Sequence, residues 1–439
     1  MLSVARKSAL LILIAMSGQA FNASGQSARQ ITIRAGSLID GTSGKVSTNQ
    51  VVIVSGDRIA QVGPSDSVRV PAGAEAIDLS RATVLPGLLD CHTHVFEHAN
   101  RWPQYADYDA EIREQSASYR TLQAMVDAQH DLESGFTTIG DLETMGAPYS
   151  DVDLRKAIDR GMVPGPRMQV ATNGIAVTGG YYPTGFDYPF GEELPHTMDV
   201  VDSAQEARKA VRTQIMYGAD VIKLYSMWSW GFEPDGRPWY RPGPTLEETQ
   251  AVIDEAHREG RKVGCHAYGG EGLRNCVVAG GDSVEHGFDL DAATIAEMVK
   301  RGTYLVPTSY LYFIQQEADL ARSNGKNSRM RIQQESFPRA LAAGVKITFG
   351  TGVGPFPHGT EAKEFGRLVA MGMSPTQALL SSTNVCPQLM GWQDRVGSLE
   401  PGKFADIIAV EGNPLTDISV LERVKFVMKG GVVIRNDLK

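Results

Sequence analysis

The sequence has few cysteines, no excess of positive charge and no apolar run long enough to cross a bilayer. Its 439 residues include four cysteines, and the formal net charge is −9. A net acidic chain without a basic cluster argues against a nucleic-acid partner. Four cysteines in a chain of this length do not indicate a disulfide framework, although a single bridge stays open. The length favours one large domain with a smaller one.

The N-terminal 25 residues are expected to be a signal peptide. Arg6 and Lys7 precede a short apolar run over residues 8–16, and small residues follow up to Gly25. This order is typical of an export signal, and the run is shorter than the about 20 residues that span a bilayer. We expect a periplasmic or secreted protein, cleavage near Ala20 or Gly25, and no stable membrane insertion afterwards. An uncleaved anchor is the alternative.

The middle of the chain alternates short apolar strands with helices. In the clearest unit, a capping box at Thr245 opens a helix that ends at Gly260, and a strand follows. The expected strands cover residues 85–94, 136–141, 167–170, 221–225, 262–266, 283–286, 303–306 and 346–350. Eight strands with helical spacers favour a (β/α)8 TIM barrel. An open doubly wound sheet is the competitor, but the sequence lacks a glycine-rich phosphate loop after the first strand.

Both ends of the chain are rich in short strands and turns. Each end is too small to be stable alone, so we expect residues 26–85 and 396–439 to pair into one β-sandwich. The prediction is therefore an α/β protein with a barrel over residues 86–395 and a flanking sandwich built from both chain ends.

Histidines and one lysine lie at the ends of several predicted strands. His92 and His94 point to the same side of a strand, which makes half of a metal site. His266 and His286 end the fifth and sixth strands, and Lys223 lies in the fourth. Because the carboxyl ends of barrel strands form one face, we expect these five side chains to meet there and bind metal.

Lys223 lies among aliphatic residues, where a charged amine is unfavourable unless it is paired or neutral. One solution is an ion pair with a buried acid. The other is reaction of the neutral amine with carbon dioxide, which gives a carbamate able to bridge two metal ions. The nearby histidines favour the second.

These motifs resemble the metal-dependent amidohydrolases of the imidazolonepropionase-like and Xaa-Pro dipeptidase-like group. The matching stretches lie at residues 86–94, 135–138, 165–168, 178–180, 218–223, 266–267, 285–287, 357–359 and 402–406. The resemblance implies a barrel with a sandwich and two metal ions, usually zinc. It implies that His92 and His94 bind one ion, that His266 and His286 bind the other, and that carboxylated Lys223 bridges them.

One position departs from that resemblance. The relatives end the eighth strand with Gly-Thr-Asp, where this chain has Gly350, Thr351 and Gly352. The missing aspartate would bind a metal ion and accept a proton from the bridging water, and loss of a general base typically removes ~10²–10⁴-fold in rate. Gly352 therefore predicts a site that assembles but hydrolyses slowly. Three interpretations of Gly352 stay open: a laboratory substitution, a natural sequence that lost the base, or replacement by another carboxylate from Glu97, Asp141 or Glu143.

Aromatic residues are concentrated in two segments after the third and fourth strands. Tyr181 begins the first segment, and Tyr225, Trp228 and Trp230 lie in or after the fourth strand. We expect them to contact an aromatic or acyl group of the substrate, with a small loop core or a subunit interface as the alternative. Tyr225 and His358 are candidates for contacts with the substrate's carboxylate or developing oxyanion.

The predicted activity is hydrolysis of an amide bond to an amino acid. The substrate would be a dipeptide or an N-acyl amino acid, and the resemblance includes exported carboxypeptidase-like enzymes and the amidohydrolases that split ochratoxin-type amides. A mononuclear deaminase and a non-catalytic metal-loaded binding protein are the alternatives. The resemblance also implies a large homo-oligomer, with an octamer as one candidate.

Overall fold

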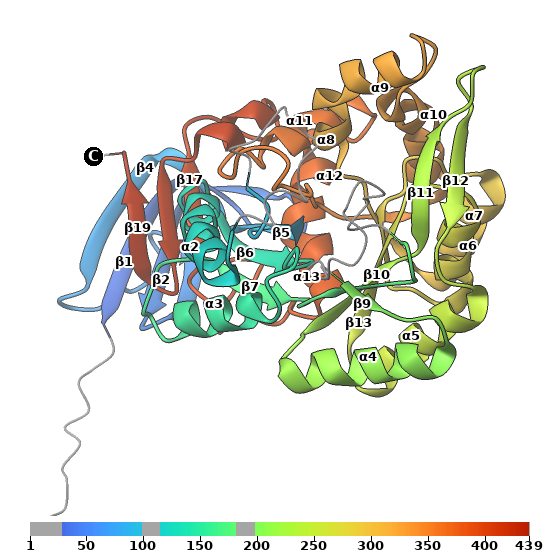
Figure 1. The fold of residues 1–439 in the computed structure, drawn as a ribbon. Coiled ribbons are helices and arrows are strands. Elements are labelled where there is room, and N and C mark those ends of the chain that lie inside the picture. Colours follow the sequence, from blue (N-terminus) through green and yellow to red (C-terminus); the bar gives the residue numbers. More distant parts are fainter. Residues whose placement is uncertain (1–28, 99–114, 181–197, 439) are drawn as a thin grey trace, which may run out of the picture.

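The structure, a computed structural model, describes residues 29–98, 115–180 and 198–438 (Figure 1). Within this part, no helix is long and apolar enough to cross a membrane. The predicted signal peptide lies outside the described residues, so its cleavage stays a prediction.

Strands from both ends of the chain form one seven-stranded sheet, which lies at the left of Figure 1. Its order is β19-β18-β17-β4-β1-β2-β3. The N-terminal strands are β1 (Gln30–Ile39), β2 (Val46–Ser55), β3 (Arg58–Pro64) and β4 (Glu75–Pro86). The C-terminal strands are β17 (Ile407–Val410), β18 (Phe426–Lys429) and β19 (Val432–Asn436). The antiparallel pairing of β17 with β4 joins the two ends of the chain. This confirms the predicted composite β-structure, whose exact domain boundaries stay predictions.

The second unit of the fold is the TIM barrel. Its strands are β5 (Leu88–Thr93), β6 (Phe136–Asp141), β7 (Arg167–Val170), β8 (Gly174–Ala176), β10 (Val221–Tyr225), β13 (Lys262–Ala267), β14 (Ser283–His286), β15 (Tyr304–Val306) and β16 (Lys346–Ile347). They pair in parallel in this order, except that β7 and β8 together occupy the third position. The barrel closes where Gly352 N donates to His92 O at 2.7 Å and His94 N donates to Val353 O at 2.8 Å.

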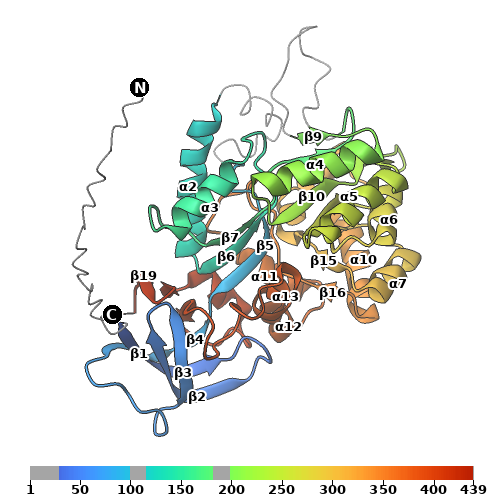
Figure 2. The ribbon, with the colours of Figure 1, turned by 90° about the horizontal axis from the view of Figure 1, so that it is seen from below.

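Helices surround the barrel strands, as the view from below shows (Figure 2). They are α2 (Ala117–Glu133), α3 (Ser150–Asp159), α4 (Ala204–Tyr217), α5 (Leu246–Arg258), α6 (Gly270–Ala279), α7 (Ala292–Arg301), α8 (Ser309–Ile314), α9 (Gln316–Arg322), α10 (Arg329–Ala343), α11 (Lys363–Ala370), α12 (Pro375–Leu380), η2 (Ser381–Val385), α13 (Cys386–Met390) and η3 (Ile418–Arg423). The predicted capping box at Thr245 opens α5. Short strands β9 (Met198–Val200), β11 (Met227–Phe232) and β12 (Pro238–Pro242) complete the described elements.

A close approach at Gly87 joins the sheet to the barrel. This residue lies between β4 and β5, and a Cβ placed on it would come within 2.1 Å of the Thr137 hydroxyl. A side chain there would push β5 away from β6, so the direct passage from one unit to the other requires glycine.

All four cysteines are paired, which corrects the expectation of at most one bridge. Cys91 pairs with Cys386 across 295 positions in the sequence, and Cys265 pairs with Cys276. The partners could not be recognised from the sequence because they meet only once strands and helices of the barrel have packed. Disulfides are typical of proteins from oxidising compartments.

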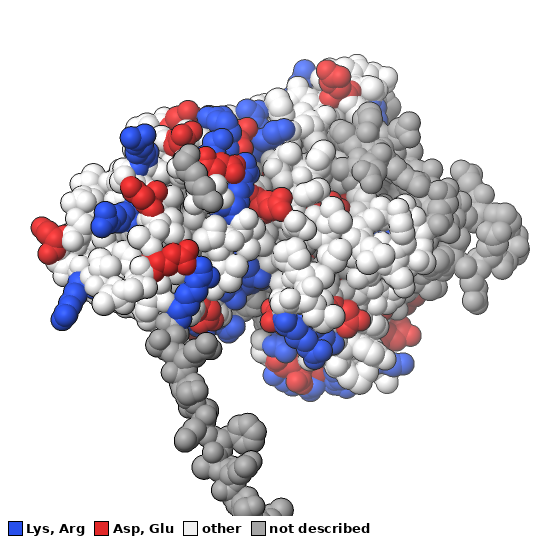
Figure 3. Space-filling model, turned by 90° about the vertical axis from the view of Figure 1, so that its left-hand side faces the viewer, with Lys and Arg blue, Asp and Glu red and all other residues white. Residues whose placement is uncertain are grey.

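Charged side chains of both signs are interspersed on the side of the molecule that Figure 3 shows. Such mixing is typical of a solvated protein surface.

Candidate metal centre

The first part of the site is the end of β5, which carries His92 and His94. Alternation along the strand turns both rings inwards, and it turns Cys91 outwards to its disulfide partner. Both histidines are buried, and their Nε2 atoms lie 3.1 Å apart. Two ring nitrogens that face each other at this distance are suited to ligating metal.

The ends of β13 and β14 bring two further histidines to the same place. Parallel pairing sets Ala267 of β13 opposite His286, so that His266 and His286 are near neighbours. Their ring centroids are 4.6 Å apart, and the His286 ring is 5.1 Å from that of His92. The structure therefore brings the four histidines together at one end of the barrel.

Lys223 completes this group from β10. Its side chain is fully buried, and its Nζ lies 3.4 Å from His92 Nε2. Desolvation lowers the pKa of the Lys223 amine, although the carboxylates of Glu285, Glu143 and Glu97 act in the opposite direction. The Lys223 amine therefore lies directly beside the His92 imidazole.

Burial also determines the charge of the imidazoles. Desolvation is the largest cause that lowers the pKa of all four rings well below 6.5, and the nearby Lys223 amine lowers it further. A neutral imidazole has a free lone pair, which is the form that binds a metal ion. Four neutral imidazoles beside a buried amine fit a centre of divalent metal ions such as zinc.

Two further residues orient the histidines, and sequence reasoning did not assign them this role. Glu285 Oε2 lies 2.8 Å from His92 Nδ1, and Thr308 Oγ1 lies 2.8 Å from His286 Nδ1. Partners on Nδ1 leave Nε2 to face the metal position. Glu285 adjoins His286 in the sequence, a signal that could have pointed to it, whereas nothing in the sequence marks Thr308.

The backbone is strained at two of these positions. His286 has a φ of 79° and Thr308 a φ of 46°, both in the left-handed region that non-glycine residues rarely adopt. Such strain is found at functional sites, where the surrounding structure holds it in place. It lets His286 turn its ring towards His92 and His266 at the very end of β14.

Gly352 lies beside His286, in the position that the missing aspartate would occupy. It has a φ of 61°, and a Cβ built on it would lie 3.5 Å from Thr308 Cγ2 and 3.9 Å from His286 Cε1. These are ordinary van der Waals contacts, so a Cβ has room, although the positive φ strains any residue other than glycine. The structure offers space for an acid here, while the chain provides none.

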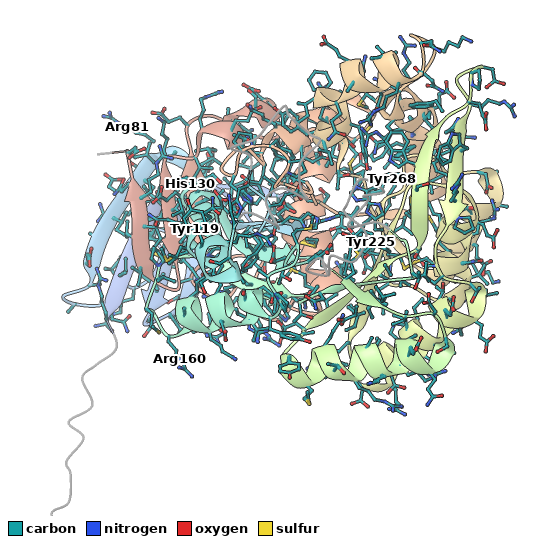
Figure 4. The ribbon with its side chains drawn as sticks, in the orientation of Figure 1. Arg81, Tyr119, His130, Arg160, Tyr225 and Tyr268 are labelled. Carbon is teal, nitrogen blue, oxygen red and sulfur yellow. A yellow bond between two sulfur atoms is a disulfide. The ribbon has the colours of Figure 1, made fainter. Side chains whose placement is uncertain are left out.

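Tyr225 lies on the wall of the site and contacts a buried acid. Its hydroxyl donates to Glu143, and its ring is 4.8 Å from the His266 ring. Burial raises the pKa of Glu143 to about 7, and the hydrogen bond from Tyr225 opposes this rise. Tyr268, which the sequence did not single out, also contacts His266, with ring centroids 4.7 Å apart; Figure 4 labels Tyr225 and Tyr268.

Trp230 belongs to a group of aromatic rings that adjoins the histidines. It meets the edges of Tyr268 at 5.6 Å and Phe288 at 6.4 Å, while the Arg329 guanidinium lies 4.4 Å from its ring centroid. Trp230 is therefore part of a packed cluster and close to the site at once. The side chain of Trp228 and the whole of Tyr181 lie outside the described residues.

His358 uses both of its ring nitrogens in contacts with the protein. Nδ1 lies 2.8 Å from Asp131 Oδ1, and Nε2 lies 3.3 Å from His94 O. In the described ranges, Asp131, His358 and Glu361 form a compact group of possible metal ligands, with ligand atoms within 4.8 Å of one another. The contact of His358 with substrate stays a prediction.

Comparison with known proteins identifies the family. Residues 83–434 match the amidohydrolase family. Ochratoxinase from Aspergillus niger is 30% identical over 94% of this chain and 88% of its own. Among solved structures, a Xaa-Pro dipeptidase with bound methionine superposes with a TM-score of 0.82 and 32% identity, over 93% of this chain and all of that one. The A. niger ochratoxinase structure gives a TM-score of 0.79 and 26% identity, over 93% and 96% of the two chains. The chain therefore belongs to the amidohydrolase family and is a hydrolase of C–N bonds.

Proposed function

We propose that this protein is a binuclear metal-dependent amidohydrolase that cleaves an amide bond to an amino acid. The observation that carries the proposal is the meeting of four buried imidazoles and the buried Lys223 amine at one end of the barrel. His92 and His94 would bind one zinc or other divalent ion, and His266 and His286 the other. When bound, such ions polarise a carbonyl group and lower the pKa of bound water.

Lys223 would bridge the two ions as a carbamate. In that modification, the neutral amine attacks carbon dioxide, a C–N bond forms, and one proton leaves to solvent. Desolvation supports this step because it lowers the pKa of the amine and so favours the neutral nucleophile. The competing ion pair would require an ionised acid beside Lys223; burial raises the pKa of both Glu143 and Glu285 to about 7, which makes their ionised forms less favourable than in water.

Hydrolysis would then add water across the amide bond. The C–N bond breaks, the acyl carbon gains the hydroxyl, and the leaving nitrogen gains a proton. The chain lacks the acid that would move this proton at position 352, so we propose slow turnover. Among the acids considered from the sequence, Glu143 accepts a hydrogen bond from Tyr225 and acts on the pKa of Lys223, whereas Asp141 Oδ1 accepts one from the Val95 amide.

The aromatic walls of the site support a substrate with an aromatic group. Tyr225 and Tyr268 flank His266, and Trp230 packs behind Tyr268. Aromatic rings bind other rings by stacked or edge contacts. Together with the similarity to ochratoxinase, this favours an N-acyl or aromatic-acyl amino acid such as ochratoxin A, or a dipeptide, as the substrate.

Two other functions use the same residues. A mononuclear deaminase-type hydrolase would need no bridging lysine, so the burial of Lys223 beside His92 speaks against it. A non-catalytic metal-loaded binding protein is favoured by Gly352, which leaves the space beside His286 without an acid. The number of zinc ions bound at the four histidines separates the first alternative, and turnover separates the second.

We also propose an exported protein that forms a homo-oligomer. The two disulfides support export because such bonds persist in oxidising compartments. Sedimentation of the purified protein tests the oligomer, and mass spectrometry of protein from the cell envelope or medium tests signal cleavage.

Turnover of a panel of substrates by the zinc-loaded protein tests the activity. The panel should pair N-acyl-phenylalanines with N-acyl-alanines and dipeptides, and the released amino acid should be measured. We expect slow release that His266→Ala abolishes. No release above that of His266→Ala from any member, both in the wild type and in Gly352→Asp, would overturn the amidohydrolase proposal.

A further inference from the structure

Beside the histidine centre, three buried side chains direct acceptor atoms at one another. Asp131 lies on α2, and His358 and Glu361 lie in the loop between β16 and α11. Their side chains are at most 1% exposed. None of these three residues is one of the four histidines of the metal centre or Lys223.

The backbone contact of His358 fixes where its proton lies. Nε2 is 3.3 Å from the carbonyl oxygen of His94, and a carbonyl can only accept, so Nε2 carries the hydrogen. A neutral ring then has a bare lone pair on Nδ1. That lone pair faces Asp131 Oδ1 at 2.8 Å, which is itself an acceptor when the acid is ionised. A histidine that ligates metal typically donates its other N–H to a carbonyl in this way.

The carboxylates of Asp131 and Glu361 also place acceptor atoms close to each other. Asp131 and Glu361 are within hydrogen-bonding reach of each other, and Glu361 Oε1 also lies 3.8 Å from His358 Nδ1. Asp131 Oδ2 is buried and has no hydrogen-bond partner among the described residues, although the Gly359 amide acts on the Asp131 carboxyl group and lowers its pKa. Glu361 Oε1 accepts from Gly359 N at 2.9 Å, and Glu361 Oε2 receives a long contact of 3.4 Å from the Ser134 hydroxyl.

Something positive must lie between these atoms. Burial raises the pKa of Asp131 to about 7 and that of Glu361 well above 4.5, and the groups that oppose these rises, among them the Gly359 amide at Asp131 and His358 at Glu361, include no lysine or arginine. Either two protons or one divalent cation would satisfy the three acceptors. A single divalent cation would leave the group neutral, because the two carboxylates together carry a charge of −2 and the imidazole carries none.

We propose that Asp131, His358 and Glu361 form a further divalent metal site, separate from the histidine centre. Ligand atoms within 4.8 Å of one another are compatible with a single ion, because zinc binds nitrogen and carboxylate oxygen at roughly 2.0–2.2 Å. One imidazole and two carboxylates suit zinc or manganese. The ion would link α2 to the loop after β16 and, through His358, to the backbone of His94.

Zinc content of matched variants tests this site. The zinc-reconstituted wild type, Asp131→Asn and Glu361→Gln are compared after removal of loose metal. We expect each variant to hold one equivalent less than the wild type. Asp151→Asn is the control, because Asp151 is equally buried but accepts from the Thr172 and Val152 amides. Equal zinc content in all four proteins would show that protons fill the group and would overturn the proposal.

Two measurements separate this site from the histidine centre and from misfolding. His266→Ala should lose zinc of the histidine centre while the equivalent that depends on Asp131 remains, so failure of either site is recognised independently. Crystals of the zinc-loaded wild type need no variant. An anomalous peak within about 2.2 Å of all three side chains supports the site, and the absence of a peak there contradicts it.

Discussion

Restoring an acid at position 352 should increase turnover more than any other single change. Gly352 has the left-handed φ of 61° that aspartate and asparagine adopt more readily than other side chains, and its Cβ would meet nothing closer than 3.5 Å. The new carboxylate would lie beside His286, where it could take a proton from attacking water. Because a general base contributes ~10²–10⁴-fold, we expect Gly352→Asp to raise kcat at least about tenfold, which is about 1.4 kcal/mol of barrier.

The assay is amino acid release from an N-acyl-phenylalanine by the zinc-loaded protein. Gly352→Asn is the matched control, because it has the same shape and backbone demand but cannot act as a base. Both variants give up the flexibility of glycine, so a comparable change in Tm is expected for each. The reasoning is refuted if Gly352→Asp leaves kcat unchanged, or if Gly352→Asn raises it equally.

Three further changes test separate parts of the site. Thr308→Val removes the hydroxyl bound to His286 Nδ1 and should weaken zinc binding roughly 10–100-fold by competition with a chelator, whereas unchanged affinity would deny Thr308 an orienting role. Trp230→Ala should raise KM for an aromatic-acyl substrate but not for an acetyl substrate, with Trp230→Phe as control; equal KM values would show that Trp230 only packs the loop. Burial raises the pKa of Asp151 from 3.8 to about 7, so the folded protein keeps this proton longer and its free energy of unfolding should fall as pH rises from about 4 to 7. Asp151→Asn should reduce that slope by about 1.4 kcal/mol per pH unit in denaturant titrations, and an unchanged slope would show that Asp151 is ionised throughout.

The sequence predicted the barrel because its signals are local. Apolar strands, the capping box at Thr245 and histidines at strand ends can each be recognised within a few residues. Strand alternation was enough to place His92 and His94 together. The position of Lys223 in the fourth strand predicted it as their partner, and the structure sets its amine 3.4 Å from His92.

What the sequence could not show depends on contacts between distant segments. Cys91 and Cys386 are paired only because the helix after the eighth strand packs against the first strand. Thr308 reaches His286 through an unusual backbone conformation, which no residue type announces. His358 was predicted as a substrate contact because its motif lies near the site, but its two neighbours, Asp131 and His94, come from other elements.

The arrangement of metal at Lys223 tests the account most directly. Crystals of the zinc-loaded wild type, grown with bicarbonate, should show two anomalous zinc peaks among His92, His94, His266 and His286. Density for a carboxyl group should extend from Lys223 Nζ between the two peaks. A single zinc ion, with an unmodified amine at Lys223, would contradict the binuclear centre.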